Sequence, residues 1–219
     1  MLNCVRLLFY CKIGIYMSKF LSIILLLTPI LMMGQGSNQE VIREIDRAIG
    51  RISSMRCDFV QTKHIRMLNN DMVSEGQMNY KPNKLRWEYK KPYQFLFLVN
   101  GNNVTMLRNG RREQINTNQN KVFREIVNIM MSSVVGKCLS DTKNYRTSIA
   151  TQGSTWLATI VPLRKELKQL FTKFVITFDK NIGAVTQVVL YEKNGDCTTI
   201  KLRNIKLNTP TADDTFVAK

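Results

Sequence analysis

Residues 79–92 read NYKPNKLRWEYKKP, and charged residues alternate here with apolar and aromatic ones. Five of the fourteen residues are Lys or Arg and three are aromatic. The stretch could therefore be a basic strip for nucleic acid or one ordinary strand of a sheet. Leu85, Trp87 and Tyr89 share one face of a strand, and charged residues occupy the other. The alternation favours a two-faced strand with its aromatic side inward and its charges in water.

The period of two continues along most of the chain. Asn109-Gly110 and the stretch 193–196 are strong hairpin signals, and most connections are too short for parallel crossovers. We therefore expect one mostly antiparallel, meandering sheet with a few helices on one face. The expected strands are 56–61, 72–80, 85–90, 94–99, 104–107, 111–116, 145–150, 155–161, 173–178, 184–191 and 198–207. The strand 94–99 (QFLFLV) is apolar on both faces.

Two segments have helical patterns instead. Ser37 and Glu40 have capping-box spacing and begin an amphipathic helix that extends to Ile52. Residues 121–135 (KVFREIVNIMMSSVV) predict a second helix, which stops near Gly136. This second helix is apolar around most of its circumference, so it should be buried or cover an apolar hollow.

The N-terminal region predicts export. Residues 20–33 form an apolar run of fourteen, preceded by Lys19 and followed by small residues. This pattern indicates a secretory signal peptide rather than a membrane anchor, since a span needs about twenty apolar residues. We expect residues 1–36 to comprise an upstream extension and a signal peptide starting at Met17, with cleavage after Gly34 or Gly36. Residues 37–219 then form a single soluble domain, because no Cys follows the run to be acylated.

The charge of the chain argues only weakly for nucleic acid. The net charge of +16 becomes +13 without residues 1–36, which contain Arg6, Lys12 and Lys19 and no acid. The basic residues are spread along the whole chain, and no recognition motif is present. A generally solvated basic surface, suited to anionic membranes, is the better interpretation.

The sequence offers little catalytic chemistry. His64 is the only histidine and has no obvious partner in the sequence, and no GxSxG, HExxH, Walker or GxGxxG motif occurs. We therefore expect no catalytic residues, no metal and no cofactor. Cys57, Cys138 and Cys197 have no CxxC spacing, so one disulfide with a free thiol and three thiols both stay open.

A family resemblance covers residues 37–219. Phe59-Val60-Gln61, then Gly76, then the stretch from Tyr80 to Pro92 resemble the outer-membrane lipoprotein carrier (LolA-like) family. The resemblance implies an α+β fold, in which an incomplete antiparallel β-barrel is closed by a helical lid over an apolar cavity. It places Lys81 where the family has an Arg that holds the lid. Lys keeps the charge but loses the planar fork of donors.

The resemblance also implies a function. It predicts a monomeric periplasmic carrier of a Gram-negative bacterium, which takes acylated lipoproteins from an inner-membrane lipoprotein-releasing ABC transporter to an outer-membrane acceptor. The alternatives are a lipid-sensing or protein-interaction module on the same fold and a cryptic hydrolase. The residues expected to bind lipid are Phe59, Leu85, Trp87, Tyr89, Phe95, Phe97, Met130 and Met131. The two methionines are adaptable enough for varied acyl chains, but they are equally compatible with plain core packing.

Overall fold

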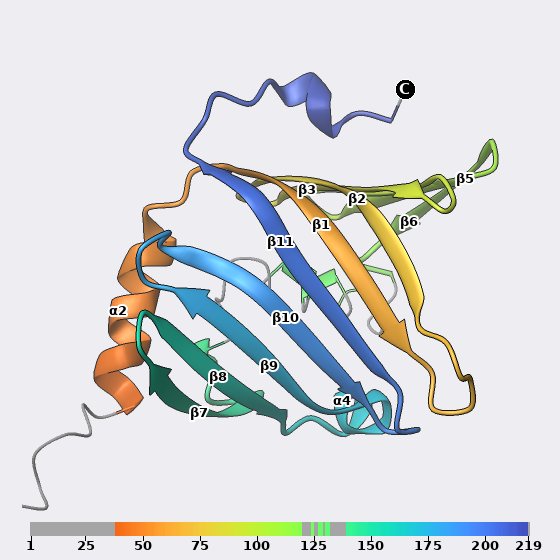
Figure 1. Cartoon of the computed structure of the whole chain (residues 1–219). Coiled ribbons are helices and arrows are strands. Elements are labelled where there is room, and N and C mark those ends of the chain that lie inside the picture. The colour runs from red at the N-terminus through yellow and green to blue at the C-terminus, as the bar shows by residue number, and fades with distance from the viewer. Residues whose placement is uncertain (1–37, 120–123, 125–126, 129, 132–138, 219) are drawn as a thin grey trace, which may run out of the picture. The chain divides into compact units, whose positions relative to one another are not determined.

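Eleven antiparallel strands form one sheet in the computed structural model, in the order β6-β5-β4-β3-β2-β1-β11-β10-β9-β8-β7 (Figure 1). The strongly curved sheet is unclosed, because β6 and β7 stand at opposite ends of this order. The strands are β1 Met55–His64, β2 Met72–Lys81, β3 Lys84–Lys91, β4 Phe95–Asn100, β5 Asn103–Arg108, β6 Arg111–Asn116, β7 Tyr145–Gln152, β8 Thr155–Pro162, β9 Phe171–Asp179, β10 Ala184–Glu192 and β11 Cys197–Leu207. All eleven strand predictions are confirmed.

The structure describes residues 38–119, 124, 127, 128, 130, 131 and 139–218. Residues Asn38–Lys219 form one compact unit, and the fold described here is that of this unit. The predicted signal peptide and its cleavage sites lie outside the described residues.

The first predicted helix is confirmed as α2, Asn38–Gly50 (Figure 1). Its buried residues are Ile45 and Ile49, and the backbone N–H of Ile149 in β7 donates to Asn38 Oδ1 at 3.4 Å. The apolar stripe of α2 therefore packs against the β7 side of the sheet, as amphipathic periodicity requires.

The second predicted helix is described only in part. Arg124, Val127, Asn128, Met130 and Met131 are helical, and the rest of residues 121–135 lie outside the described residues. Val127 is buried in the main core, and the two methionines pack partly buried against it. These residues agree with a helical segment that contacts the apolar face of the sheet.

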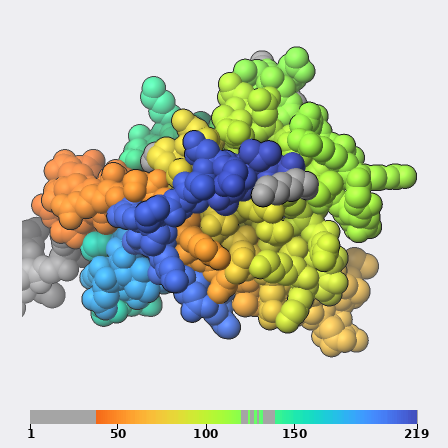
Figure 2. Space-filling view, turned by 90° about the horizontal axis from the view of Figure 1, so that it is seen from above, coloured from red at the N-terminus to blue at the C-terminus, as the bar shows by residue number. Residues whose placement is uncertain are grey.

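Two short helices were not predicted. They are α4, Lys165–Leu170, and a 3₁₀ turn, η3, at Asp213–Phe216. The turn belongs to the C-terminal segment, which crosses the yellow and green strands in Figure 2. There Phe216 is only 1% exposed and packs with Leu96 and Leu98 of β4. This contact explains why β4 is apolar on both faces: Phe97 and Val99 face the main core, while the two leucines lie beneath the tail.

The hairpin signal at residues 109–110 is also confirmed. Asn109 and Gly110 join β5 to β6 with φ values of 49° and 76°. Positive φ at both central residues is the geometry that Asn-Gly favours in tight hairpins. The short turn fixes the β5–β6 register from Arg108↔Arg111 to Asn103↔Asn116.

Candidate functional site

A glycine organises the aromatic part of the apolar face. Gly76 of β2 lies between Phe59 of β1 and Tyr89 of β3 in the strand register. A Cβ at Gly76 would lie 2.5 Å from the Phe59 ring and 2.0 Å from the carbonyl oxygen of Glu88. The ring of Phe59 therefore occupies the space above the Gly76 backbone, which only glycine leaves open.

From this position Phe59 contacts the aromatic residues of β3. Its ring centroid lies 4.5 Å from that of Trp87 and 5.1 Å from that of Tyr89, the latter edge-on. The Tyr89 hydroxyl donates a hydrogen bond to Gln61 Oε1 at 2.9 Å. Three separate pieces of the sequence motif, around residues 59–61, 76 and 87–89, thus form one contact group across three strands. All of these residues were singled out in the sequence. Their contact with one another depends on the β1–β2 and β2–β3 registers, which could not be predicted from the sequence.

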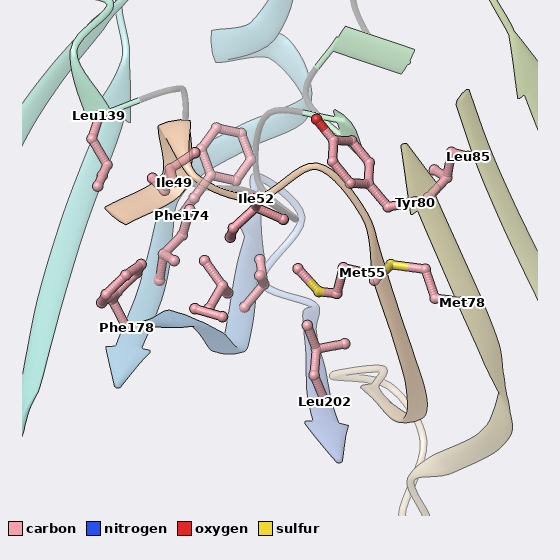
Figure 3. Close-up of a cluster of buried hydrophobic side chains, with 14 of the residues drawn as sticks. Ile49, Ile52, Met55, Met78, Tyr80, Leu85, Leu139, Phe174, Phe178 and Leu202 are labelled. Atoms are coloured by element: carbon pink, nitrogen blue, oxygen red, sulfur yellow. The ribbon is translucent and has the colours of Figure 1, made fainter. Parts of the chain in front are cut away.

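The apolar face continues away from this group in cross-strand rows. One row joins Met78, Trp87, Phe97 and Met106, and the next joins Tyr80, Leu85, Val99 and Val104. From the other half of the sheet, β7 to β11 all contribute residues to the same core. Figure 3 shows side chains from both sides converging, among them Ile49, Met55, Met78, Tyr80, Phe174, Phe178 and Leu202. We call the face of the sheet that carries this cluster the inner face.

All eight residues predicted to bind lipid belong to this one cluster. The buried members are Phe59, Leu85, Trp87 and Phe97, and the partly buried members packed on it are Tyr89, Phe95, Met130 and Met131. Leu85 is 0% exposed. A charge placed at Leu85 would therefore disturb the fold itself, so the partly exposed members are the better positions at which to test ligand contact. Lipid contact by these residues stays a prediction.

Lys81 makes a different contact from the lid contact predicted for it. Its Nζ lies 3.3 Å from Asp213 Oδ1, and Lys84 Nζ lies 3.1 Å from the same oxygen. Hydrogen bonds from Lys84 and Lys81 lower the pKa of Asp213. The Arg86 guanidinium also donates to the carbonyl oxygens of Thr215 and Val217. These contacts hold the C-terminal tail; a lid contact by Lys81 stays a prediction.

The inner face has polar atoms but favours their neutral forms. Burial raises the pKa of Tyr89 to about 12, and the neighbouring Tyr93 adds to the shift. Burial likewise raises the pKa of Tyr80. The indole N–H of Trp87 is buried, and among the described residues it has no acceptor of good hydrogen-bond geometry. It lies near the Tyr89 hydroxyl and acts against burial by lowering the pKa of Tyr89. An uncharged ligand thus meets no ionised side chain from these tyrosines at neutral pH.

The remaining reactive residues lie elsewhere. His64, at the end of β1, has a partner that the sequence did not reveal: its Nδ1 lies 2.8 Å from Asp71 Oδ1, and both side chains are about half exposed. Within residues 38–119 and 139–218, no three metal-ligating side chains gather into a binding site. In the same part of the chain, no helix is long and apolar enough to cross a bilayer.

The structure also narrows the cysteine alternatives. Cys57 and Cys197 are free thiols. Cys197 pairs in register with His64, seven residues along β1 from Cys57. That separation is about 23 Å at ~3.3 Å per residue, whereas a disulfide needs Cα atoms within about 7 Å. These two cysteines therefore cannot bond to each other, and Cys138 lies outside the described residues.

An unclosed, strongly curved antiparallel sheet with an apolar inner face and a helical segment packed on it defines a half-barrel class of binding proteins. Residues 50–219 match the model of one family of this class, the outer membrane lipoprotein carrier protein LolA. The chain belongs to this family, whose members are carriers or binding proteins rather than enzymes. The predicted fold class is thereby confirmed.

Solved structures resemble this chain at low sequence identity. LolA superfamily protein NE2245 from Nitrosomonas europaea is 9% identical, covers 84% of this chain and 99% of its own, and has a TM-score of 0.45. Lipoprotein LppX from Mycobacterium tuberculosis is 12% identical, with coverages of 82% and 99% and a TM-score of 0.45. MucB is 13% identical with a TM-score of 0.50, and the match covers 85% of this chain and 65% of MucB. A search of curated proteins finds no match.

Proposed function

We propose that this protein is a periplasmic carrier that shields the acyl chains of lipoproteins against its inner face and moves them from the inner to the outer membrane. The observation that carries the proposal is the convergence of the eight predicted residues, with the helical residue Val127, in one apolar cluster. Membership of the lipoprotein carrier family supports the same class of ligand. The proposed donor is an inner-membrane lipoprotein-releasing ABC transporter, and the proposed recipient is an outer-membrane acceptor.

The energetics of an acyl chain explain why such a carrier needs this face. Leaving a sixteen-carbon chain in water costs about 13 kcal/mol at ~0.8 kcal/mol per CH₂. A carrier must recover most of this free energy and yet release the chain to the next site. Partly exposed Met130 and Met131 on the helical segment suit this requirement, because thioether side chains adapt to ligands of different shape.

The polar part of the inner face suits the other end of the ligand. The indole N–H of Trp87 is a donor without a partner of good geometry among the described residues, and the Tyr89 hydroxyl beside it already donates to Gln61. The ester carbonyls of an acylated lipoprotein are uncharged acceptors. We propose that Tyr89, Phe95 and the methionines contact the ligand, while fully buried Phe59 and Leu85 support the shape of the face.

The test uses the two tryptophans of the protein. Trp156 packs on Phe178 with ring centroids 5.6 Å apart, and a phenylalanine can keep an aromatic contact there. Trp156→Phe therefore leaves Trp87 as the one fluorescent tryptophan of the sequence. The processed protein, purified from the periplasm, is titrated with a palmitoylated peptide and with the same peptide without the acyl chain. Saturable change with the acylated peptide alone is the expected result.

A double variant locates the site. Met130→Gln with Met131→Gln should weaken binding at least tenfold, because two polar amides replace apolar contacts. Ile182→Gln, at an exposed position in the β9–β10 turn, is the matched control and should bind as the parent does. Equal responses to acylated and bare peptide would refute acyl-chain binding. Capture of a protein partner without lipid would favour the interaction-module alternative.

A further inference from the structure

Most of the exposed large apolar side chains among the described residues lie at one end of the strands, which is one of the two loop-bearing edges of the sheet. Among the described residues, eight large hydrophobic side chains are exposed, and six of them lie at the edge where β1 meets β2, β3 meets β4 and α4 meets β9. We call this the loop edge. Its exposed apolar residues are Met67 (92% exposed), Leu68, Met72, Val73, Tyr93 and Leu170.

The loop that presents Met67 is held in place by its neighbours. His64 and Asp71 form a contact across its base at 2.8 Å. The Arg66 backbone N–H donates to Asp196 Oδ1 in the β10–β11 turn at 3.0 Å, and the Leu68 N–H donates to the Ile65 carbonyl at 2.8 Å. These contacts fix the loop in a position where Met67 stays in water instead of packing onto the protein. An apolar side chain held in water in this way indicates an interaction site.

Positive charge flanks these apolar residues. Residues 63–73, 90–94 and 108–112 contain seven Lys or Arg and a single acid, Asp71. Two of the seven pair with acids outside these ranges, Lys63 with Glu192 at 3.0 Å and Lys91 with Glu75 at 3.8 Å. The ladder places these segments next to one another, because β2 pairs with β3, β3 with β4 and β4 with β5. Lys90 and Lys91 of β3 and Arg108, Arg111 and Arg112 at the β5–β6 turn are all exposed. Lys90 and Lys91 therefore lie on the strand next to β2, and the arginines of the β5–β6 turn lie four strand spacings from the β1–β2 loop.

We propose that the loop edge is a docking surface for an anionic phospholipid bilayer. Met67 and Leu68 enter between the lipid headgroups, Tyr93 lies at the interface, and the arginines and lysines face the phosphates. A lipid surface fits these observations better than a protein does, because the apolar side chains stand on a protruding loop rather than in a shaped recess. Attraction between the cations and anionic lipid acts within about 8 Å at physiological salt, so it needs charges beside the loop and no fixed contact geometry. The proposal does not rest on acyl-chain binding at the inner face.

Vesicle sedimentation tests the proposal. The processed protein is mixed with vesicles of phosphatidylcholine alone and of phosphatidylcholine with 30% phosphatidylglycerol, at low and at high salt. All variants share one N-terminus, so any contribution from residues 1–37 cancels. We expect binding to the anionic vesicles, weakened but not abolished by salt, and much weaker binding to the neutral ones.

Two double variants separate the apolar and the electrostatic contributions. Met67→Ser with Leu68→Ser should lower affinity at least tenfold and remove the salt-resistant part. Arg111→Ala with Arg112→Ala should lower affinity for anionic vesicles by about fivefold per arginine and leave binding to neutral vesicles unchanged. Ile182→Ser, at a 44% exposed apolar position on the opposite edge, is the control and should bind like the parent. If the Met67→Ser, Leu68→Ser variant unfolds, Met67→Ser alone takes its place, because the Met67 side chain is 92% exposed and contributes little to packing.

Two different results would overturn the proposal. Unchanged binding of the Met67→Ser, Leu68→Ser variant would mean general electrostatic attraction and would overturn the proposal. Absence of binding to protein-free vesicles, with retained binding to native membranes, would assign the loop edge to a protein partner and would overturn it too.

Discussion

Replacement of Gly76 by Ala tests whether the aromatic group depends on an empty position in β2. The added methyl carbon would start 2.0 Å from the Glu88 carbonyl oxygen and 2.5 Å from the Phe59 ring. The carbonyl belongs to the backbone of β3, so the clash cannot be relieved by turning a side chain. Either β2 and β3 separate locally or the Phe59 ring leaves Trp87 and Tyr89 while the backbone shifts.

The expected loss follows from the contacts at risk. Two aromatic contacts of Phe59 contribute about 0.5–1.5 kcal/mol each, and two backbone hydrogen bonds about 0.5–1.5 kcal/mol each. Gly76→Ala should therefore lower the free energy of unfolding by about 2–6 kcal/mol. With a urea dependence of about 2 kcal/mol per molar, the unfolding midpoint should fall by about 1–3 M.

Urea unfolding followed by tryptophan fluorescence measures this shift. Gly50→Ala is the matched control, since a Cβ there meets nothing within 4 Å; this variant should match or slightly exceed the parent in stability. Phe59→Leu combined with Gly76→Ala should recover only part of the loss, because the Glu88 carbonyl stays in the way. A Gly76→Ala variant within 1 kcal/mol of the parent would refute the reasoning.

Two further variants test other contacts. Phe216→Ala should cost about 3–5 kcal/mol, because it empties a buried site between the tail and Leu96 and Leu98; urea unfolding measures the loss, and protease cleavage within the tail should accelerate. Tyr89→Phe should cost about 1 kcal/mol through the lost hydrogen bond to Gln61. Since the pKa of Tyr89 is raised from 10 to about 12, the parent should lose stability as pH rises from 10 through 12, and Tyr89→Phe should lose less. Equal slopes for both proteins would contradict this assignment.

The strands were predictable because alternation is a local signal. Leu85, Trp87 and Tyr89 point to one face whatever lies opposite them, so their inward direction could be inferred from spacing alone. The Asn109-Gly110 turn was predictable for the same reason, since its positive φ values depend on the two residues themselves.

The contacts between distant segments were not predictable in this way. The tail offers one aromatic residue, Phe216, next to the smaller apolar Val217, and nothing in its sequence specifies β4 as its partner. The one indication in the sequence was that residues 94–99 are apolar on both faces, which predicts that another segment covers the outer face of this strand. The glycine at position 76 was visible in the sequence, but its role was not, because that role depends on the Phe59 ring of β1 lying over it.

The pairing of β1 with β11 has a consequence for how the chain folds. His64 pairs with Cys197 and Met55 with Leu207, so the partners of β1 on this side arrive at least 133 residues later in the chain. Until β11 is present, the strands can form only two separate meanders, β1 to β6 and β7 to β10, each with an open edge. Contacts of such long sequence separation form slowly. Of the eleven strands, β11 leaves the ribosome last, and it is also the strand that unites the two meanders, so the sheet cannot be completed before β11 has been made.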